Sequence, residues 1–170
     1  VLKELERFEE ALASYDTAIR IRPDYVDAYY NRGVTLKKLQ RLEEALASYD
    51  QAIAIKPHYA EAHANRGVIL EELQRFEEAL VIYNEAICIN PHYADAYYNR
   101  GNALKELERF EEAIASYDQA NAIKPDYVEA YSNRGIALQD LKRFDEALAS
   151  YHQAIAIKPD YANAHWNLSL

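Results

Sequence analysis

The chain has 170 residues, of which 50% are hydrophobic and 28% are charged, and its formal net charge is −9 at pH 7. This composition excludes a disordered or fibrous protein, and the acidic balance argues against a nucleic-acid partner, which requires a clustered basic face. No apolar run is long enough to span a membrane and no signal segment opens the sequence, so we expect a cytoplasmic protein with no membrane partner.

All prolines and all glycines recur at one fixed interval of 34 residues. They are Pro23, Pro57, Pro91, Pro125 and Pro159, and Gly33, Gly67, Gly101 and Gly135. Such a period is typical of a repeat array. Residues 26–59, 60–93, 94–127 and 128–161 form four full repeats, whereas residues 1–25 and 162–170 are partial repeats. We therefore expect a single array over residues 1–170, and the absence of methionine indicates a piece of a longer protein.

Each repeat contains two stretches in which apolar residues recur every three or four positions, as in amphipathic helices. In residues 26–59 these are Ala28, Tyr29, Leu36 and Leu39, followed by Ala45, Leu46, Tyr49, Ala52 and Ile53. The segment 40–42 separates the two stretches, and Pro57 ends the second because proline disfavours helical geometry in the residue before it. We expect an antiparallel helix pair in every repeat, no β-strand and an all-α fold.

Two finer features of the helices can also be predicted. Asp24 with Asp27 three residues later predicts a side-chain cap at the start of the first helix. A glycine inside a helix costs about 1 kcal/mol relative to alanine, so Gly33 needs a packing reason. We expect it to face the small Ala45 of the partner helix, with the same pairing in the other repeats.

The ordered residues of the repeat resemble the tetratricopeptide repeat. In residues 26–59 the matching positions are Tyr29, Gly33, Leu36, Ala45, Tyr49, Ala52 and Pro57. The resemblance implies an α-solenoid, a right-handed superhelix of stacked helix pairs whose first helices line a concave groove. It also implies a protein–protein interaction scaffold that binds an extended peptide or protein segment there, without catalysis or a cofactor. The departures are an arginine before each glycine, and a histidine in place of the leading aromatic at His63 and His165.

One asparagine occupies the same place in the first helix of every repeat. The column is Asn31, Asn65, Asn99, Asn133 and Asn167. A carboxamide offers both a donor and an acceptor, so such a column can hold an extended peptide backbone. It resembles the asparagine ladder in the superhelix of O-linked N-acetylglucosamine transferases. The alternative is that each asparagine bonds to a neighbouring helix and orders the stack.

Variable residues around the asparagines are candidates for ligand selectivity. They are the aromatic Tyr30, Tyr98 and Trp166, the polar Asn102, and the basic Lys37 and Lys105. An acidic row of Asp27, Glu61, Asp95 and Glu129 favours basic or neutral ligands. Acids near helix starts are equally well explained as ordinary complements of the helix dipole. Acids also stand where a carboxylate-clamp domain needs basic residues, which disfavours that class of ligand.

The arginine before each glycine is expected to be partly buried, and a buried charge requires a partner. These arginines are Arg32, Arg66, Arg100 and Arg134. The candidate partners in second helices are Asp16, Asp50 and Asp118, although Asn84 and His152 interrupt this acidic column. Alternatively, the four arginines form a row that binds phosphate.

No catalytic or metal-binding constellation is expected. His58, Glu61 and His63 bridge a turn and lack the helical spacing of a metalloprotease. Cys88 replaces an alanine of other repeats and is expected to be a small packing residue. Asn121 replaces an isoleucine, which should weaken its repeat locally, and no function explains it.

Three functions remain open. The first is a non-enzymatic scaffold for a peptide or protein ligand. The second is a substrate-recruiting region of a larger bacterial glycosyltransferase-like enzyme, because residues 164–170 resemble the junction before such a domain. The third is head-to-tail self-association through the uncapped ends, which carry Val1 and Leu2 at one terminus and Trp166, Leu168 and Leu170 at the other.

Overall fold

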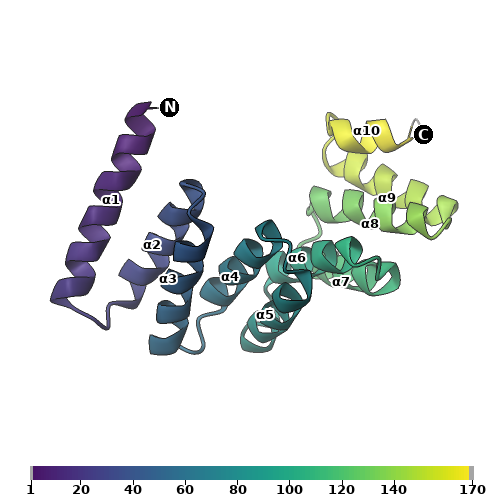
Figure 1. Cartoon of the computed structure of the whole chain (residues 1–170). Coiled ribbons are helices and arrows are strands. Elements are labelled where there is room, and N and C mark those ends of the chain that lie inside the picture. The colour runs from purple at the N-terminus through teal and green to yellow at the C-terminus, as the bar shows by residue number, and fades with distance from the viewer. Residues whose placement is uncertain (1, 169–170) are drawn as a thin grey trace. The chain divides into compact units, whose positions relative to one another are not determined.

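The computed structural model describes residues 2–168, with side chains from residue 7, as helices joined by short turns (Figure 1). The helices are α1 (Leu2–Ile21), α2 (Val26–Lys38), α3 (Leu42–Ile55), α4 (Ala60–Glu72), α5 (Phe76–Ile89), α6 (Ala94–Glu106), α7 (Phe110–Ile123), α8 (Val128–Asp140), α9 (Phe144–Ile157) and α10 (Ala162–Leu168). The described range contains no strand. Over the same range, no helix combines the length and apolar character needed to cross a bilayer.

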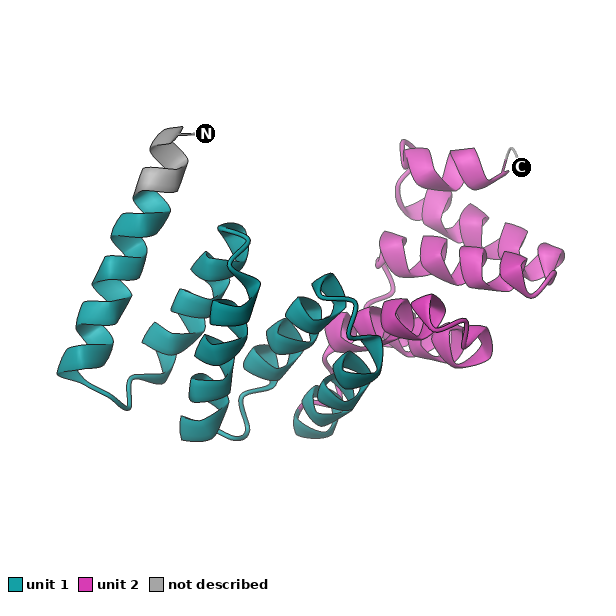
Figure 2. Cartoon of the chain, viewed as in Figure 1, with its two compact units in different colours: residues 1–89 teal, residues 90–170 magenta. Residues whose placement is uncertain are grey.

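The chain divides into two compact units, residues 1–89 with α1–α5 and residues 90–170 with α6–α10 (Figure 2). In the first unit α2 packs on α3 and α4 on α5, with α1 on α2 and α3 on α4. In the second unit α6 packs on α7 and α8 on α9, with α7 on α8 and α10 on α9. The predicted fold class, an all-α solenoid built from helix pairs, is confirmed. A single continuous array over residues 1–170 stays a prediction.

The first helix differs from its predicted pattern. By the repeat register, residues 1–5 end one helix and a turn follows before the next, but α1 runs unbroken from Leu2 to Ile21. In the four complete repeats, the turn is made by a residue with positive φ, namely Gln40, Gln74, Glu108 and Lys142.

Each glycine packs against an aromatic ring rather than an alanine. A Cβ atom added at Gly33 would lie 2.7 Å from Cε1 of Tyr49, and the other glycines meet Tyr83, Tyr117 and Tyr151 in the same way. All four tyrosines are buried. The nearest atoms therefore belong to Tyr49 and not to Ala45, the predicted partner of Gly33, and the glycine does serve close helix packing. The ring reaches the glycine because Tyr49 lies one turn beyond Ala45 on the same helix face.

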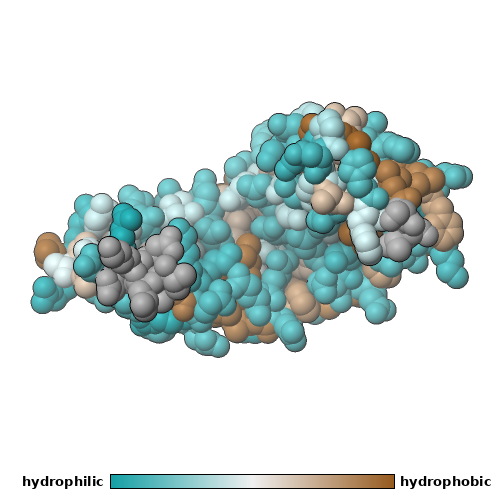
Figure 3. Space-filling view, turned by 90° about the horizontal axis from the view of Figure 1, so that it is seen from above, coloured by the Kyte–Doolittle hydropathy of each residue, from teal (hydrophilic) through white to brown (hydrophobic). Residues whose placement is uncertain are grey.

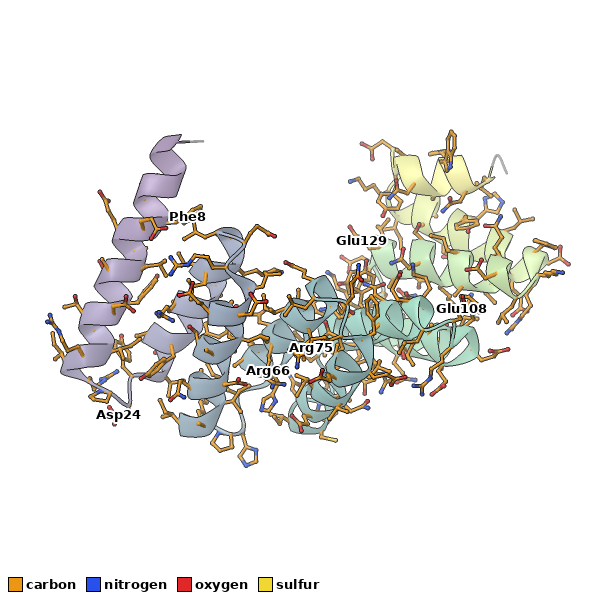
Figure 4. The ribbon with its side chains drawn as sticks, viewed as in Figure 1. Phe8, Asp24, Arg66, Arg75, Glu108 and Glu129 are labelled. Carbon is orange, nitrogen blue, oxygen red and sulfur yellow. The ribbon has the colours of Figure 1, made fainter. Side chains whose placement is uncertain are left out.

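Helix starts also differ from the predicted caps. The N-cap of α2 is Tyr25, with no side-chain cap, and its backbone carbonyl accepts from the N–H groups of Ala28 and Tyr29. The cap predicted for Asp24 is therefore wrong. Second helices instead begin with a paired arginine and glutamate. Just before α5, Arg75 (labelled in Figure 4) donates from Nε and Nη2 to the carboxylate oxygens of Glu78 over 2.7 and 2.6 Å.

Candidate functional site

The asparagine column lies on α2, α4, α6, α8 and α10, and its members differ in solvent exposure. Asn31 on α2 is exposed, whereas Asn65, Asn99, Asn133 and Asn167 are half-buried. The surface in Figure 3 is mainly hydrophilic, with small separate hydrophobic areas. The hydrogen bonds that each asparagine already makes decide what it can still offer to a ligand.

In the first unit, Asn65 belongs to a tyrosine cluster formed by Tyr30, Tyr49 and Tyr59. The Tyr30 ring centroid lies 5.0 Å from that of Tyr59 and 5.9 Å, edge-on, from that of Tyr49. The Nδ2 group of Asn65 donates to the Tyr30 hydroxyl over 2.9 Å. Burial raises the pKa of Tyr59 to about 12 and also raises that of Tyr30. The phenols therefore stay neutral and hold the Asn65 carboxamide in one place.

In the second unit, the matching cluster of Tyr98, Tyr117 and Tyr127 contains an additional polar residue. The Tyr98 centroid lies 4.9 Å from that of Tyr127 and 6.1 Å from that of Tyr117. Asn133 Nδ2 donates to the Tyr98 hydroxyl over 3.2 Å and to Oδ1 of Asn102 over 2.9 Å. The Tyr117 hydroxyl donates to the same Oδ1 over 2.9 Å. Asn102 thus ties Asn133 and Tyr117 together.

The two clusters leave their asparagines with different hydrogen-bonding capacity. A carboxamide has two N–H donors and one carbonyl acceptor. Asn65 uses one donor in the cluster, which leaves a donor and the carbonyl. Asn133 uses Nδ2 toward two acceptors, which leaves only its carbonyl. The first unit has Val34 in the place of Asn102, and the Tyr49 hydroxyl has no hydrogen-bond partner among the described residues.

Both interpretations of the asparagine column therefore have a counterpart in the structure. Asn65 on α4 and Asn133 on α8 each bond to the preceding first helix, as the stacking alternative predicts. Asn31 and the free part of Asn65 remain available to a ligand. The column as a ligand site stays a prediction.

The other predicted site residues are distributed as follows. The acidic row of Asp27, Glu61, Asp95 and Glu129 is exposed in the first turns of α2, α4, α6 and α8, and Glu129 is labelled in Figure 4. Burial and a hydrogen bond to Asp95 raise the pKa of Tyr127. Lys37 pairs with Glu72 over 3.2 Å and Lys105 with Glu106 over 2.9 Å. Trp166 is 68% exposed on α10. The two lysines are thus partly neutralised within the chain.

A cleft of about 430 Å³ brings Asn31 together with cationic and aromatic side chains. Arg7, Phe8 and Tyr15 of α1 form one wall, and Asn31 and Lys38 of α2 form the other. Lys38 Nζ lies 5.4 Å from the centre of the Phe8 ring, and Phe8 is labelled in Figure 4. The sequence predicted Lys38, next to Lys37, on the groove face, but it did not point to Arg7, Phe8 or Tyr15 as site residues. The repeat register could have pointed to the residues on α1, because it places α1 beside α2.

The arginine column forms the predicted ion pairs between helices. Nε of Arg32, Arg66 and Arg134 donates to Asp16, Asp50 and Asp118 over 2.7, 2.6 and 2.6 Å, and Arg66 is labelled in Figure 4. This hypothesis is confirmed for these three arginines. Nε of Arg100 donates to Ser116 over 3.1 Å, and burial lowers the pKa of Arg100. Charges already paired in this way are poorly placed to form a row that binds phosphate.

His63 takes part in helix packing. It is buried, with Nε2 2.9 Å from the Pro57 carbonyl oxygen and Nδ1 3.1 Å from a Glu85 carboxylate oxygen. His58 is exposed. Cys88 is exposed on α5, so its prediction as a packing residue is wrong. The alanines that occupy the same position elsewhere are exposed too, because this position faces solvent in every repeat: Ala54, Ala122 and Ala156.

Two protein-family models match the sequence, and both describe tetratricopeptide repeats. A family model described as "TPR repeat" matches residues 1–40, 69–107 and 101–142, and one described as "Tetratricopeptide repeat" matches residues 26–59 and 128–161. No curated protein matches the sequence. The match to this family supports a role of the chain as a protein-interaction scaffold.

Several solved structures share the fold. The crystal structure of MamA is 25% identical, with 91% of each chain covered and a TM-score of 0.85. YrrB, described as a TPR protein with an unusual peptide-binding site, is 24% identical, with 99% of this chain and 87% of that chain covered and a TM-score of 0.83. A thermophilic TPR protein of Thermus thermophilus is 27% identical, with 99% and 94% covered and a TM-score of 0.77. The chain belongs to the tetratricopeptide-repeat family.

Proposed function

We propose that the chain binds an extended peptide or protein segment along its first helices, with asparagine carboxamides contacting the ligand backbone. The observation that carries this proposal is the hydrogen bond from Asn65 to Tyr30. It fixes the carboxamide while leaving one N–H donor and the carbonyl acceptor for a ligand. A peptide unit presents the complementary pair, so Asn65 can bind it through two hydrogen bonds.

The side chains around Asn31 and Asn65 favour a mixed ligand. The exposed carboxylates of Asp27 and Glu61 lie in the first turns of α2 and α4, which favours basic or neutral residues there. Arg7 and Lys38 line the cleft at Asn31, which favours an acidic residue at that point. Likeness to YrrB is one of fold, so the proposal rests on these residues.

A peptide-array screen followed by alanine substitutions tests this function. The strongest binder of the array is labelled, and its affinity is measured by fluorescence anisotropy for Asn65→Ala and Asn133→Ala. We expect Asn65→Ala to weaken binding about tenfold, because it removes hydrogen bonds to the ligand, and Asn133→Ala to change it little. Urea unfolding of both variants is the control. Lost stability with unchanged peptide affinity for Asn65→Ala would contradict the proposal.

A second candidate is self-association, which an exposed apolar face of the second unit favours. Leu148 is 43% exposed, whereas Leu80 and Ile114 at the same place in other repeats are 6% exposed. Phe144, at 56% exposure, and Leu168 line the same hollow as Leu148. A helix with the repeat's own pattern fits it, and we propose α1 of a second copy. The predicted contact residues Val1 and Leu170, and the Leu2 side chain, lie outside the described residues.

Light scattering over a concentration series tests self-association, with Leu148→Glu as the matched variant. We expect mass to rise with concentration for the original chain and to stay monomeric for Leu148→Glu. A constant monomeric mass for both would contradict the second candidate. That the chain recruits substrates for a glycosyltransferase-like domain stays a prediction, which reading the gene beyond Leu170 tests.

A further inference from the structure

Asn121 on α7 is a buried polar residue whose carboxamide has no partner. The residue is 7% exposed, and neither Oδ1 nor Nδ2 has a hydrogen bond within the described part of the chain. The other complete repeats carry isoleucine at this place: Ile53, Ile87 and Ile155. A buried carboxamide without partners is costly, so its presence at an isoleucine position calls for a physical reason.

Asn121 lines a cleft of about 400 Å³ within the second unit. The walls come from α7 and from α9, the second helices of two adjacent repeats, and Tyr131 and Arg134 of α8 lie between them. At about 100° per residue, these two side chains lie about 160° and about 100° around α8 from Asn133. The cleft is therefore distinct from the asparagine column and from the proposed peptide site.

The charges and the Ser150 hydroxyl in this cleft are already engaged. Arg134 Nε donates to Asp118 over 2.6 Å, and its Nη1 donates to the Ser150 hydroxyl. Ser150 in turn donates to the Glu146 carbonyl over 3.0 Å. Because the ion pair is neutral as a whole, the cleft offers little attraction to a phosphate, a carboxylate or a free cation.

The groups that remain are neutral donors and acceptors. Asn121 contributes a full carboxamide, Gln153 on α9 contributes an exposed one, and Tyr131 contributes a phenol. Both polar atoms of Asn121 are shielded from solvent, so the side chain must turn to meet a ligand in the cleft. That turn breaks no hydrogen bond, because the carboxamide makes none.

We propose that this cleft binds the side-chain carboxamide of a glutamine or asparagine presented by a partner polypeptide. Two carboxamides pair through two N–H···O hydrogen bonds, each supplying one donor and one acceptor. Asn121 gains partners on binding, whereas isoleucine at the same place would offer none. The site uses different side chains and a different ligand group from the proposed peptide site, so it does not depend on that function.

An NMR titration of the ¹⁵N-labelled full chain tests the proposal, with acetylglutamine N-methylamide as the probe. The isosteric acetylglutamate N-methylamide is the control ligand. We expect the glutamine probe to shift the side-chain NH₂ signals of Asn121 and Gln153 and the backbone signal of Tyr131. The glutamate probe and the Asn121→Ile variant should each weaken this binding about tenfold. The variant is expected to fold, because three other repeats carry isoleucine there.

Three results would overturn the inference. They are equal shifts with both probes, unchanged shifts in Asn121→Ile, and no shift at Asn121 up to the solubility limit of the glutamine probe. The side-chain signal of Asn65, followed during a separate titration with the array peptide, reports on the proposed peptide site. Peptide binding at Asn65 with no probe binding at Asn121 would reject this inference alone.

Discussion

Asn133 on α8 donates a side-chain N–H to the carboxamide oxygen of Asn102 on α6 over 2.9 Å. The same oxygen accepts the Tyr117 hydroxyl. At the matching place in the first unit stands Val34, and the matching Tyr49 hydroxyl has no partner among the described residues. Asn102 therefore occupies an Nδ2 hydrogen of Asn133 in an internal hydrogen bond, and that hydrogen is not available to a ligand.

The substitutions Asn102→Val and Val34→Asn form a reciprocal pair. Asn102→Val leaves the buried Tyr117 hydroxyl without its acceptor, so the free energy of unfolding should fall by about 1–3 kcal/mol. Val34→Asn gives the Tyr49 hydroxyl an acceptor, so that free energy should rise by about 1 kcal/mol. Urea unfolding measures both changes. Changes of the free energy of unfolding in the same direction for both variants would contradict the stabilising role assigned to the hydrogen bond between Asn102 and Tyr117.

Gly67→Ala should destabilise the first unit despite the better helix propensity of alanine. The new Cβ would lie 2.5 Å from Cε1 of the buried Tyr83 ring, so the ring or the helix must shift. Overpacking of this kind costs about 1–3 kcal/mol, against about 1 kcal/mol gained from helix propensity. Thermal unfolding followed by circular dichroism gives the net effect. Gln51→Ala at an exposed helix position is the control, and an equal or higher melting temperature for Gly67→Ala would contradict the prediction.

The ion pairs between helices should stabilise more than those within one helix. Arg66 and Asp50 are paired over 2.6 Å with side-chain exposures of 23% and 50%, whereas Arg75 and Glu78 are more exposed at 44% and 57%. Double-mutant cycles should give a coupling of about 1 kcal/mol for the first pair and a smaller coupling for the second. Both values should fall in high salt. A larger coupling for Arg75 and Glu78 would contradict the role of partial burial.

The repeat register predicts relationships between columns of residues more securely than individual contacts. A fixed offset of 16 residues separates Asp50 from Arg66. The two residues pair because both lie at the interface between α3 and α4. The nearest neighbour of Gly33 is Tyr49, which the pattern could not tell from Ala45 because the two lie one turn apart on one face. Side-chain reach, which the pattern does not encode, then decides between them.

The candidate site depends on single residues that depart from the repeat. Asn65 and Asn133 find a tyrosine hydroxyl in the preceding repeat, at Tyr30 and Tyr98, whereas Ala64 and Ser132 hold that place in alternate repeats. The sequence contained this alternation, but a hydrogen bond between residues 35 positions apart requires the geometry of stacked helices. Burial of Asn121 followed from the register, whereas its missing partners did not.

Asn121→Ile should raise the stability of the chain whatever the ligand of the cleft. Removing a buried carboxamide with no hydrogen bonds recovers a desolvation cost of about 1–3 kcal/mol. Urea unfolding checks the size of the gain. The matched reverse change, Ile155→Asn, should cost a similar amount. A decrease in stability for Asn121→Ile would show that the carboxamide is bonded in solution.

Stability should decline at alkaline pH because of the buried tyrosines. Burial raises the pKa of Tyr59 and of Tyr151 to about 12 in the folded chain, whereas tyrosine in an unfolded chain ionises near pH 10. Between about pH 10 and about pH 12 the folded state binds more protons than the unfolded state, so the free energy of unfolding falls as pH rises. Below about pH 10 both states are protonated, and these groups then cause no pH dependence.

Urea midpoints measured from about pH 9 to about pH 12, together with tyrosinate absorbance, check this alkaline window. The variant Tyr59→Phe removes one ionisable group while keeping a ring beside Tyr30, so its midpoint should fall less steeply with pH. Tyr25→Phe, which changes a tyrosine at the equivalent turn of another repeat, is the matched control. A midpoint that is constant across this range, or an equal slope in Tyr59→Phe and in the original chain, would contradict the role assigned to burial of Tyr59.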